Sequence, residues 1–478
     1  MLFSSIEFLL FFLPLFLILY GLTPDKYKNV TLLLGSLVFY ALGEPRYLFL
    51  LMLSVLINYF FGLHLGRKVK KKGKGKKKKQ KNITGERSDP DKEYKQRILY
   101  KRRKRLLVAA VALNLGLLGF FKYFAEEEAI PLGISFYTFQ ILSYLVDAYR
   151  GEEERERSIV NLAAYVVMFP QLIEGPIVNY GEVRDSLNHR KFTAAGLQDG
   201  LKVLTMGLAA KVLLADRIGL LWQEAQVKGF ESISTPLAWL AAAAYSLKLY
   251  FDFYGYSLMA SGLGRMLGFE LPPNFNNPYM AVSVRDFYRR WHMTLGRWFR
   301  RYVYIPLGGN RRGEFRTICN LTAVWVLTAL WHGTTLNFLV WGMMLAVLII
   351  IERQLAKIRL PKALRLPARV VSHLYLLAVI PVTWMCFAIT KIDELAIFLG
   401  RMFGTVPGLH VNAADWRSAL ADYGVLFAAA IAACTPVIER LFKGLKNNPV
   451  GVVVLVGLFW ICVWRIQIDG QNPFMYLF

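Results

Sequence analysis

Cysteine is scarce in this 478-residue chain, and its few copies form no paired pattern. The four residues are widely spaced, at Cys319, Cys386, Cys434 and Cys462. Because there is no CxxC pair, the sequence offers neither a zinc signature nor a disulfide framework. We therefore interpret the cysteines as small residues of apolar segments.

Several sequence motifs of soluble enzymes are also absent. The chain has no Walker A motif, which argues against ATP-driven transport within it. It has no GxSxG nucleophile elbow and no complete GxGxxG fingerprint. Histidine occurs only six times. The chemistry that remains available is that of a neutral histidine acting as a base in a dry cavity.

Charge is sparse and apolar residues are abundant. Charged residues make up 19% of the chain and hydrophobic residues 55%, whereas soluble proteins carry roughly 25% charged residues. This composition excludes a disordered protein and disfavours an ordinary soluble enzyme. It indicates an all-α polytopic membrane protein that forms a single membrane domain over residues 1–478.

Apolar segments long enough to cross a membrane recur along the chain. Met1–Tyr20 lacks a basic leader and a small-residue cleavage site, so we expect a first span and not a removed signal peptide. The other candidates lie near 29–43, 46–65, 106–124, 132–148, 158–174, 201–222, 236–256, 317–332, 335–351, 370–389, 421–438 and 450–467. Several are short, so we predict about 10–12 true spans together with re-entrant or interfacial helices.

The basic residues are concentrated in one segment. Between Arg67 and Arg105 there are 20 Lys or Arg and 4 Asp or Glu, and the whole chain has a net charge of +25. We expect residues 66–105 to form a cytoplasmic loop, disordered over Lys70–Lys81, and three spans before it to place the N-terminus outside. Contact with anionic lipid is the main alternative for this loop, and nucleic-acid binding is a weaker one.

Residues 271–312 are too charged to span a membrane, yet they are rich in aromatics. Phe287, Trp291, Leu295, Trp298 and Tyr302 recur at spacings of three and four, which predicts one apolar helix face. The arginines of the other faces are Arg285, Arg289, Arg290, Arg297, Arg300 and Arg301. We expect an amphipathic helix in the membrane interface, with its arginines toward headgroups or an anionic ligand.

Two histidines have informative surroundings. His332 lies between two apolar runs, so it is either a functional intramembrane residue or a core histidine bonded between helices, and the residues alone leave both readings open. For His292, within the amphipathic segment, the residues favour a structural role beside a tryptophan. We interpret the others as structural or solvated: His64, His189, His373 and His410. Glu174 lies in a Pro- and Gly-flanked stretch that is typical of a broken helix lining a cavity.

The combination of motifs resembles the membrane-bound O-acyltransferase family, in the branch that O-acetylates alginate. The resemblance is carried mainly by Val284–Leu295, Tyr304–Arg311 and Trp331–Gly333. Further matching segments are Leu2–Ser5, Gly133–Gln140, Phe169–Ile173, Asn274–Tyr279 and the ending Pro473–Phe474. The resemblance covers nearly the whole chain. It implies a ring of helices around a thin central region that funnels approach from both membrane faces.

The resemblance also implies roles for particular residues. It makes His332 the general base and His292 a second catalytic residue that stabilises the oxyanion, a task that a nearby Trp or a backbone N–H group could share. As further candidates for the lining of the substrate tunnel it indicates Trp291, Trp331, Asn277, Arg289, Arg290, Gln171 and Glu174. Related sequences often carry Ala in place of Glu174, so this extra carboxylate is a departure whose role stays open.

The activity implied by the resemblance is transfer of an acetyl group across the bacterial cytoplasmic membrane. Acetyl-CoA is the expected cytoplasmic donor, with no tightly bound cofactor and no metal. The expected acceptor is an extracytoplasmic hydroxyl, reached through an esterase-like acetyltransferase partner or on the polysaccharide itself. Two alternatives remain: transfer of D-alanine from a carrier protein to teichoic acid, and a non-catalytic transporter or scaffold, which would leave the paired histidine motifs unexplained.

Overall fold

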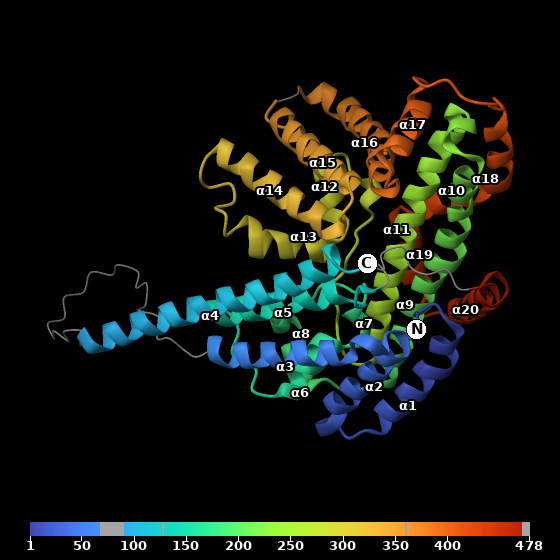
Figure 1. Cartoon of the computed structure of the whole chain (residues 1–478). Helices are drawn as coiled ribbons and strands as arrows, with labels where there is room; N and C mark the ends of the chain where they lie inside the picture. Colours follow the sequence, from blue (N-terminus) through green and yellow to red (C-terminus); the bar gives the residue numbers. More distant parts are fainter. Residues whose placement is uncertain (67–89, 127–128, 359–360, 471–478) are drawn as a thin grey trace.

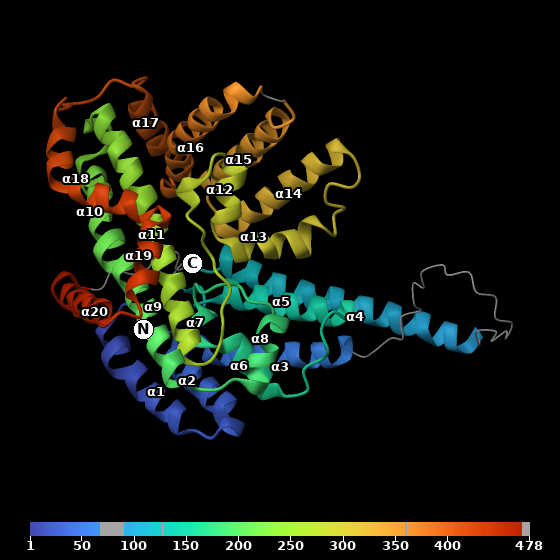
Figure 2. The same cartoon turned by 180° about the vertical axis from the view of Figure 1, so that it is seen from behind.

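The structure is a computed structural model that describes residues 1–66, 90–126, 129–358 and 361–470. Over these residues the chain is built from helices, and no strand occurs in the described part. The expectation of an all-α polytopic membrane protein is therefore confirmed. Figures 1 and 2 show three neighbouring groups of helices, and the second of them combines helices from the middle of the chain with the last helices of the chain.

The first group holds the N-terminal helices. They are the π-helix η1 (Glu7–Phe12), α1 (Leu13–Leu22), α2 (Lys28–Gly43), α3 (Leu48–Leu65), α4 (Pro90–Tyr123), α5 (Ile134–Arg150), α6 (Ile159–Val167), α7 (Phe169–Leu172) and α8 (Tyr180–His189). Helix α4 begins at Pro90, so residues 90–105 of the segment expected to be a loop are helical. The remainder of that basic segment, 67–89, with Lys70–Lys81, lies outside the described residues. Pro90 fits the first turn of a helix, where its missing N–H is not needed.

The second group is organised around the long helix α11 (Thr235–Met266), which packs against α9 (Ala194–Ala209). Glycines make this approach possible, because a Cβ on Gly207 would lie 2.5 Å from the carbonyl oxygen of Gly255. Around this pair lie the π-helix η5 (Ala210–Ala215), α10 (Asp216–Lys228), α17 (Ile392–Phe403), α18 (Asp415–Ala433), α19 (Pro436–Leu445) and α20 (Pro449–Asp469). Small residues that let backbones approach closely are typical of helix interfaces in membranes.

The interface of η5 with α11 contains a buried ion pair. Lys211 Nζ lies 2.7 Å from Asp252 and 2.8 Å from Asp216, and the side chains of Lys211 and Asp252 are only 1% and 2% exposed. Charged groups inside a membrane protein are expensive unless they are paired. This pair therefore couples η5 to α11 and fixes their register.

The third group contains the segment that the sequence predicts to be one interfacial helix. The prediction of one helix is wrong, because the segment is broken into α12 (Val284–Arg290), α13 (Met293–Phe299) and the π-helix η8 (Arg300–Tyr304). Its apolar stripe is largely buried inside the protein, with Phe287, Trp291 and Trp298 at most 8% exposed. Its place in the membrane interface stays a prediction. The group is completed by α14 (Glu314–His332), α15 (Leu336–Leu355) and α16 (Arg365–Ala388).

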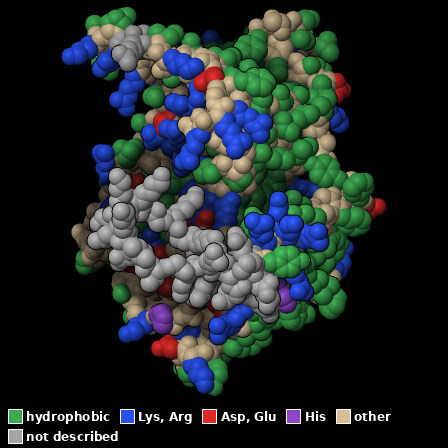
Figure 3. Space-filling view, turned by 90° about the vertical axis from the view of Figure 1, so that its left-hand side faces the viewer, with side chains coloured by type: hydrophobic (Ala, Val, Ile, Leu, Met, Phe, Trp, Pro, Cys, Tyr) green, Lys and Arg blue, Asp and Glu red, His purple; other side chains and the backbone are tan. Residues whose placement is uncertain are grey.

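Five helices of the described chain are long and apolar enough to cross a membrane. They lie at Pro45–Leu65, Arg97–Tyr123, Leu336–Leu355, Lys362–Ala388 and Pro449–Asp469, and the pair α18–α19, bent by 76°, would make a sixth if it forms one broken span. The expected 10–12 spans include shorter helices, so that number stays a prediction. Figure 3 shows Lys and Arg side chains gathered on one face, with hydrophobic side chains covering the adjacent surface.

We predict that Asp252→Ala destabilises the protein far more than removal of an exposed ion pair. The change removes the carboxylate of Asp252 from the buried Lys211, and breaking a buried pair in this way costs about 3–5 kcal/mol. The matched control is Lys443→Ala, whose pair with Glu439 has side chains 67% and 51% exposed and contributes about 0–1 kcal/mol. Unfolding in detergent measures both, and equal shifts would contradict the prediction.

Candidate active site

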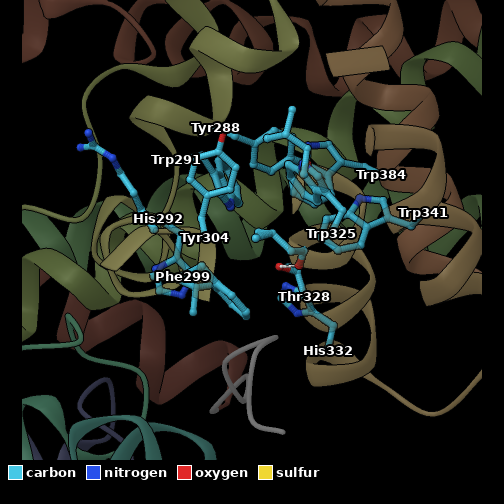
Figure 4. A pocket seen from close by; sticks show the side chains of 15 residues that line it. Tyr288, Trp291, His292, Phe299, Tyr304, Trp325, Thr328, His332, Trp341 and Trp384 are labelled. Carbon is cyan, nitrogen blue, oxygen red and sulfur yellow. Dashed lines mark hydrogen bonds between the residues drawn. The ribbon is translucent and has the colours of Figure 1, made fainter. Parts of the chain in front are cut away.

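A cavity of about 250 Å³ lies where α12, α13 and η8 face α14, α15 and α16. Figure 4 shows the side chains that line it, which are mainly aromatic. They are Tyr288, Trp291, His292, Leu295, Gly296, Phe299, Arg300, Tyr304, Leu321, Val324, Trp325, Thr328, His332, Trp341 and Trp384. The cavity thus brings His292 and His332, which the sequence singles out, to one place, with few other polar groups around them.

His332 is the last residue of α14 and is buried, at 6% exposure. Aromatic rings enclose its imidazole, with centroids 4.6 Å away for Trp331, 5.0 Å for Trp341 and 5.2 Å for Phe387. The chain can turn directly after it because residue 333 is glycine: a Cβ there would lie 2.1 Å from a ring carbon of Phe338. This packing accounts for the Trp-His-Gly sequence.

His292 lies between α12 and α13 in the left-handed backbone region, with φ 43° and ψ 53°. This conformation costs a residue with a Cβ on the order of 1–2 kcal/mol, so the surroundings must hold it in place. The imidazole is 5% exposed and packs edge-on against Phe253 of α11, with centroids 4.7 Å apart. Its Nδ1 lies 3.0 Å from Asn274 Oδ1.

The other residues that the resemblance implies for the tunnel are distributed unevenly. Trp291 lines the cavity. Trp331 is not among the lining residues, but its ring centroid lies 6.4 Å from that of His292 and 4.6 Å from that of His332. The remaining five do not line this cavity, and their role stays a prediction: Asn277, Arg289, Arg290, Gln171 and Glu174. Arg290 pairs with Asp286 at 3.1 Å, while Gln171 is buried and donates to the carbonyl oxygen of Tyr165.

The residue pattern gives no sign of several cavity-lining side chains. Trp341 and Trp384 come from helices that the sequence marks only as apolar spans. The contributions of α14, at Leu321, Val324, Trp325, Thr328 and His332, follow a helical repeat. That repeat, counted back from His332, is the one signal in the sequence that could have identified the cavity-lining residues of α14.

Lys122, near the end of α4, is a further residue that the sequence analysis does not identify. Its ammonium donates to the carbonyl oxygen of Trp331 and lies 5.6 Å from the centroid of that indole ring. The adjacent Tyr123 donates its hydroxyl to the carbonyl oxygen of Leu330 at 2.7 Å. The end of α4 therefore satisfies carbonyl groups that the last turn of α14 leaves unpaired.

A second cavity, of about 410 Å³, adjoins the first and shares Arg300 with it. Its charged lining includes Asp147, Glu153, Glu182, Arg297 and Arg301. Arg297 pairs with Glu182 at 2.7 Å and Arg301 with Asp147 at 3.0 Å. Burial raises the pKa of Glu153, although Arg184 opposes that shift. The described residues provide no ion pair for Arg300, which is exposed and free to meet a bound anion.

The described residues contain no group of three or more His, Cys, Asp or Glu side chains that could hold a metal ion. The aromatic cavity is lined by two buried imidazoles, those of His292 and His332. Among known protein families, the model of MBOAT, the membrane-bound O-acyltransferase family, matches residues 91–389 of this chain.

The chain belongs to the membrane-bound O-acyltransferase family. It is similar to the probable alginate O-acetylase AlgI of Azotobacter vinelandii, with 37% identity over 423 residues that cover 84% of this chain and 78% of that protein. The peptidoglycan O-acetyltransferase of Helicobacter pylori is 30% identical over 84% of this chain and 80% of its own length. The teichoic acid D-alanyltransferase of Bacillus subtilis is 28% identical over 45% of this chain and 57% of that protein.

These findings confirm the resemblance read from the sequence, including its alginate O-acetylation branch. The chain is therefore a multi-pass membrane enzyme that transfers acyl groups to oxygen. The family match covers both histidines and every residue that lines the aromatic cavity.

We predict that Lys122→Met weakens the contact between the end of α4 and the last turn of α14, and that it lowers both the stability of the protein and its rate of acyl transfer. A hydrogen bond from a charged group contributes about 1.5–3 kcal/mol, and its loss frees the end of α14 that carries His332. Tyr123→Phe is the matched control, because its bond to the same turn is exposed and worth about 0.5–1.5 kcal/mol. Thermal unfolding and turnover measure the effects; a larger loss for Tyr123→Phe would refute the assignment.

Proposed function

We propose that this enzyme transfers an acetyl group from cytoplasmic acetyl-CoA to an extracytoplasmic hydroxyl for O-acetylation of a polysaccharide, with His332 as general base. The observation that carries the proposal is an apolar cavity lined both by the buried His332 and by the exposed Arg300. An uncharged thioester suits the apolar part, and an anionic group suits the arginine.

The cavity has the shape that a narrow acyl-carrying arm requires. It follows one face of α14 from Leu321 to His332, which is about 16 Å along a helix axis. Val324 and Thr328 lie on the same face between them. An extended thioester arm can therefore reach His332 while the bulk of its donor stays near the protein surface.

Arg300 supports a donor that carries phosphate. It is the residue shared by the aromatic cavity and the charged cavity, so it marks the point where an arm would leave the first for the second. The arginines at 297 and 301 are already paired with carboxylates. A phosphate group of coenzyme A is a suitable partner for the guanidinium of Arg300, because arginine binds phosphate with charge-assisted hydrogen bonds.

The transfer itself needs only one proton carrier. His332 takes the proton of the acceptor hydroxyl as its oxygen attacks the thioester carbonyl, and a tetrahedral oxyanion forms. The carbon–sulfur bond then breaks, and the proton passes from His332 to the departing thiolate. The aromatic walls exclude water, which protects the thioester from hydrolysis. General-base help of this kind contributes about 10²–10⁴ in rate.

The proposed orientation places the donor side in the cytoplasm. Arg353 lies in the last turn of the spanning helix α15 and Lys357 follows that helix, and Arg353 binds Glu314 at the start of α14 at 3.0 Å. Basic residues next to spans are retained in the cytoplasm. The N-terminus of α14 then faces the cytoplasm and His332 the outer half of the membrane, in agreement with the proposed cytoplasmic basic loop and external N-terminus of a bacterial cytoplasmic membrane protein.

The relatives support an acetyl group and a sugar polymer. Those named for O-acetylation match more than four fifths of the chain, whereas the D-alanyltransferase matches less than half of it. We therefore favour acetyl transfer over D-alanyl transfer. A separate esterase-like acetyltransferase that receives the acetyl group outside the cell completes the proposed reaction path.

We predict that His332→Ala reduces release of free coenzyme A from acetyl-CoA by at least about 10²-fold in purified protein in nanodiscs. The wild type and the variant are compared with radiolabelled acetyl-CoA, and donor binding and unfolding temperature are measured in parallel. Equal rates would refute the role of His332. Activity with a D-alanyl carrier protein but not with acetyl-CoA would overturn the proposed donor.

We predict that Val324→Trp blocks the donor path. The indole would fill part of a cavity of about 250 Å³, so the KM for acetyl-CoA should rise at least about tenfold with little change in stability. The matched control is Leu327→Trp, one turn further along α14 on a side that is 44% exposed, toward lipid. An unchanged KM for Val324→Trp in folded protein would show that the donor does not use this cavity.

A further inference from the structure

Asn274 is buried, at 3% exposure, in the segment between α11 and α12, and its side chain holds His292. Its Oδ1 atom lies 3.0 Å from His292 Nδ1, 3.3 Å from the backbone nitrogen of Thr294 and 2.9 Å from Thr294 Oγ1. The backbone N–H of Thr294 can only donate, so the atom that it meets must be the amide oxygen. The amide nitrogen of Asn274 instead meets Ser257 Oγ of α11, at 3.1 Å.

This orientation determines which nitrogen of His292 carries its hydrogen. An amide oxygen accepts and never donates, so Nδ1 of His292 must carry the hydrogen. In the neutral ring, Nε2 then keeps a lone pair. Nε2 is buried and has no hydrogen-bond partner among the described residues, while the His292 side chain lines the aromatic cavity. A buried polar atom without a partner calls for an explanation, and the place of this side chain in the cavity lining makes a bound molecule a suitable partner.

The backbone around Asn274 makes this arrangement rigid. Its carbonyl oxygen accepts from the N–H of Met293 at 2.8 Å, and the N–H of Asn276 donates to the carbonyl oxygen of Arg290 at 2.9 Å. Residues on both sides of His292 are thus bound to the Asn274–Asn276 segment. These bonds hold His292 in its left-handed conformation and keep its ring against Phe253.

We propose that Asn274 is a positioning residue that fixes His292 as the Nδ1–H tautomer, so that Nε2 accepts a hydrogen bond from an N–H or O–H group of the bound substrate. A neutral His292 held in this way has no hydrogen on Nε2 to donate to an oxyanion. The proposed acceptor role therefore replaces the oxyanion role that the resemblance implies for His292. His292 and His332 then have different roles. His332 takes the proton of the acceptor hydroxyl, and His292 orients the substrate through one of its N–H or O–H groups. The substrate's identity rests on the proposed function, whereas the tautomer does not.

The tautomer can be measured directly. Solid-state NMR of protein labelled with ¹⁵N-histidine in lipid bilayers distinguishes a protonated from an unprotonated ring nitrogen, and His292→Gln assigns the signal. We expect the wild type to show His292 protonated at Nδ1 and unprotonated at Nε2. A His292 signal protonated only at Nε2 would overturn the proposal, and this measurement requires no variant of Asn274 to fold.

Variants of Asn274 then test the positioning role. Asn274→Leu removes the acceptor at similar volume, so the Nδ1–H preference of His292 should be lost and turnover should fall about 10²-fold, as expected when a reacting group is misplaced. Asn274→Asp keeps an oxygen at the same place and should restore the Nδ1–H signal. The matched control Ser257→Ala removes only the bond to the amide nitrogen and should leave the tautomer unchanged.

The outcomes separate this inference from the proposed function. An Nδ1–H signal that survives Asn274→Leu would refute the role of Asn274. The expected signals together with no coenzyme A release in any variant, wild type included, would support the positioning of His292 and refute the acetyl-CoA donor. Loss of the signal in Asn274→Leu with unchanged turnover would show that the tautomer does not matter to the reaction, and would overturn the proposal.

Discussion

The packing of α11 against its neighbours is the interaction on which the site depends. Glycine contacts with α9 and the ion pair of Lys211 with Asp252 hold α11 in one register. From that helix, Phe253 supports the His292 ring and Ser257 binds Asn274. A shift of α11 by one residue would rotate these groups away, so the arrangement of the cavity follows from a contact made far from the histidines along the chain.

Both histidines lie at the ends of helices. His332 closes α14, and His292 precedes the short helix α13. Helix ends expose backbone groups that need partners, and in a membrane protein water does not supply them. Lys122 satisfies the end of α14, and Asn274 satisfies the start of α13. The polar residues around the site are therefore required by the helix ends that position the imidazoles.

The sequence predicts the helical membrane class and singles out His332 while leaving a structural role open, and the family resemblance implies its pairing with His292. It does not predict the break at His292, because the aromatic repeat from Phe287 to Tyr302 continues through it and the bonds that cause the break come from Asn274. Periodicity reports which residues share a face but not whether a distant residue interrupts the backbone. Trp341 and Trp384 are not predicted for a related reason. In an apolar helix the local sequence does not distinguish a face that lines a cavity from a face that meets lipid.

The composition of the cavity also constrains the chemistry. Walls of indole and phenyl rings offer a thioester little charge stabilisation in the ground state, so the few polar atoms that reach the cavity must act where charge develops. In the proposed roles, with Nε2 of His292 an acceptor and His332 a base, neither imidazole starts as a donor to an oxyanion. The other side-chain donors in the cavity lining are the N–H groups of its tryptophans, the hydroxyls of Tyr288, Tyr304 and Thr328, and the guanidinium of Arg300. Under the proposal, one of these groups or a backbone N–H serves the oxyanion.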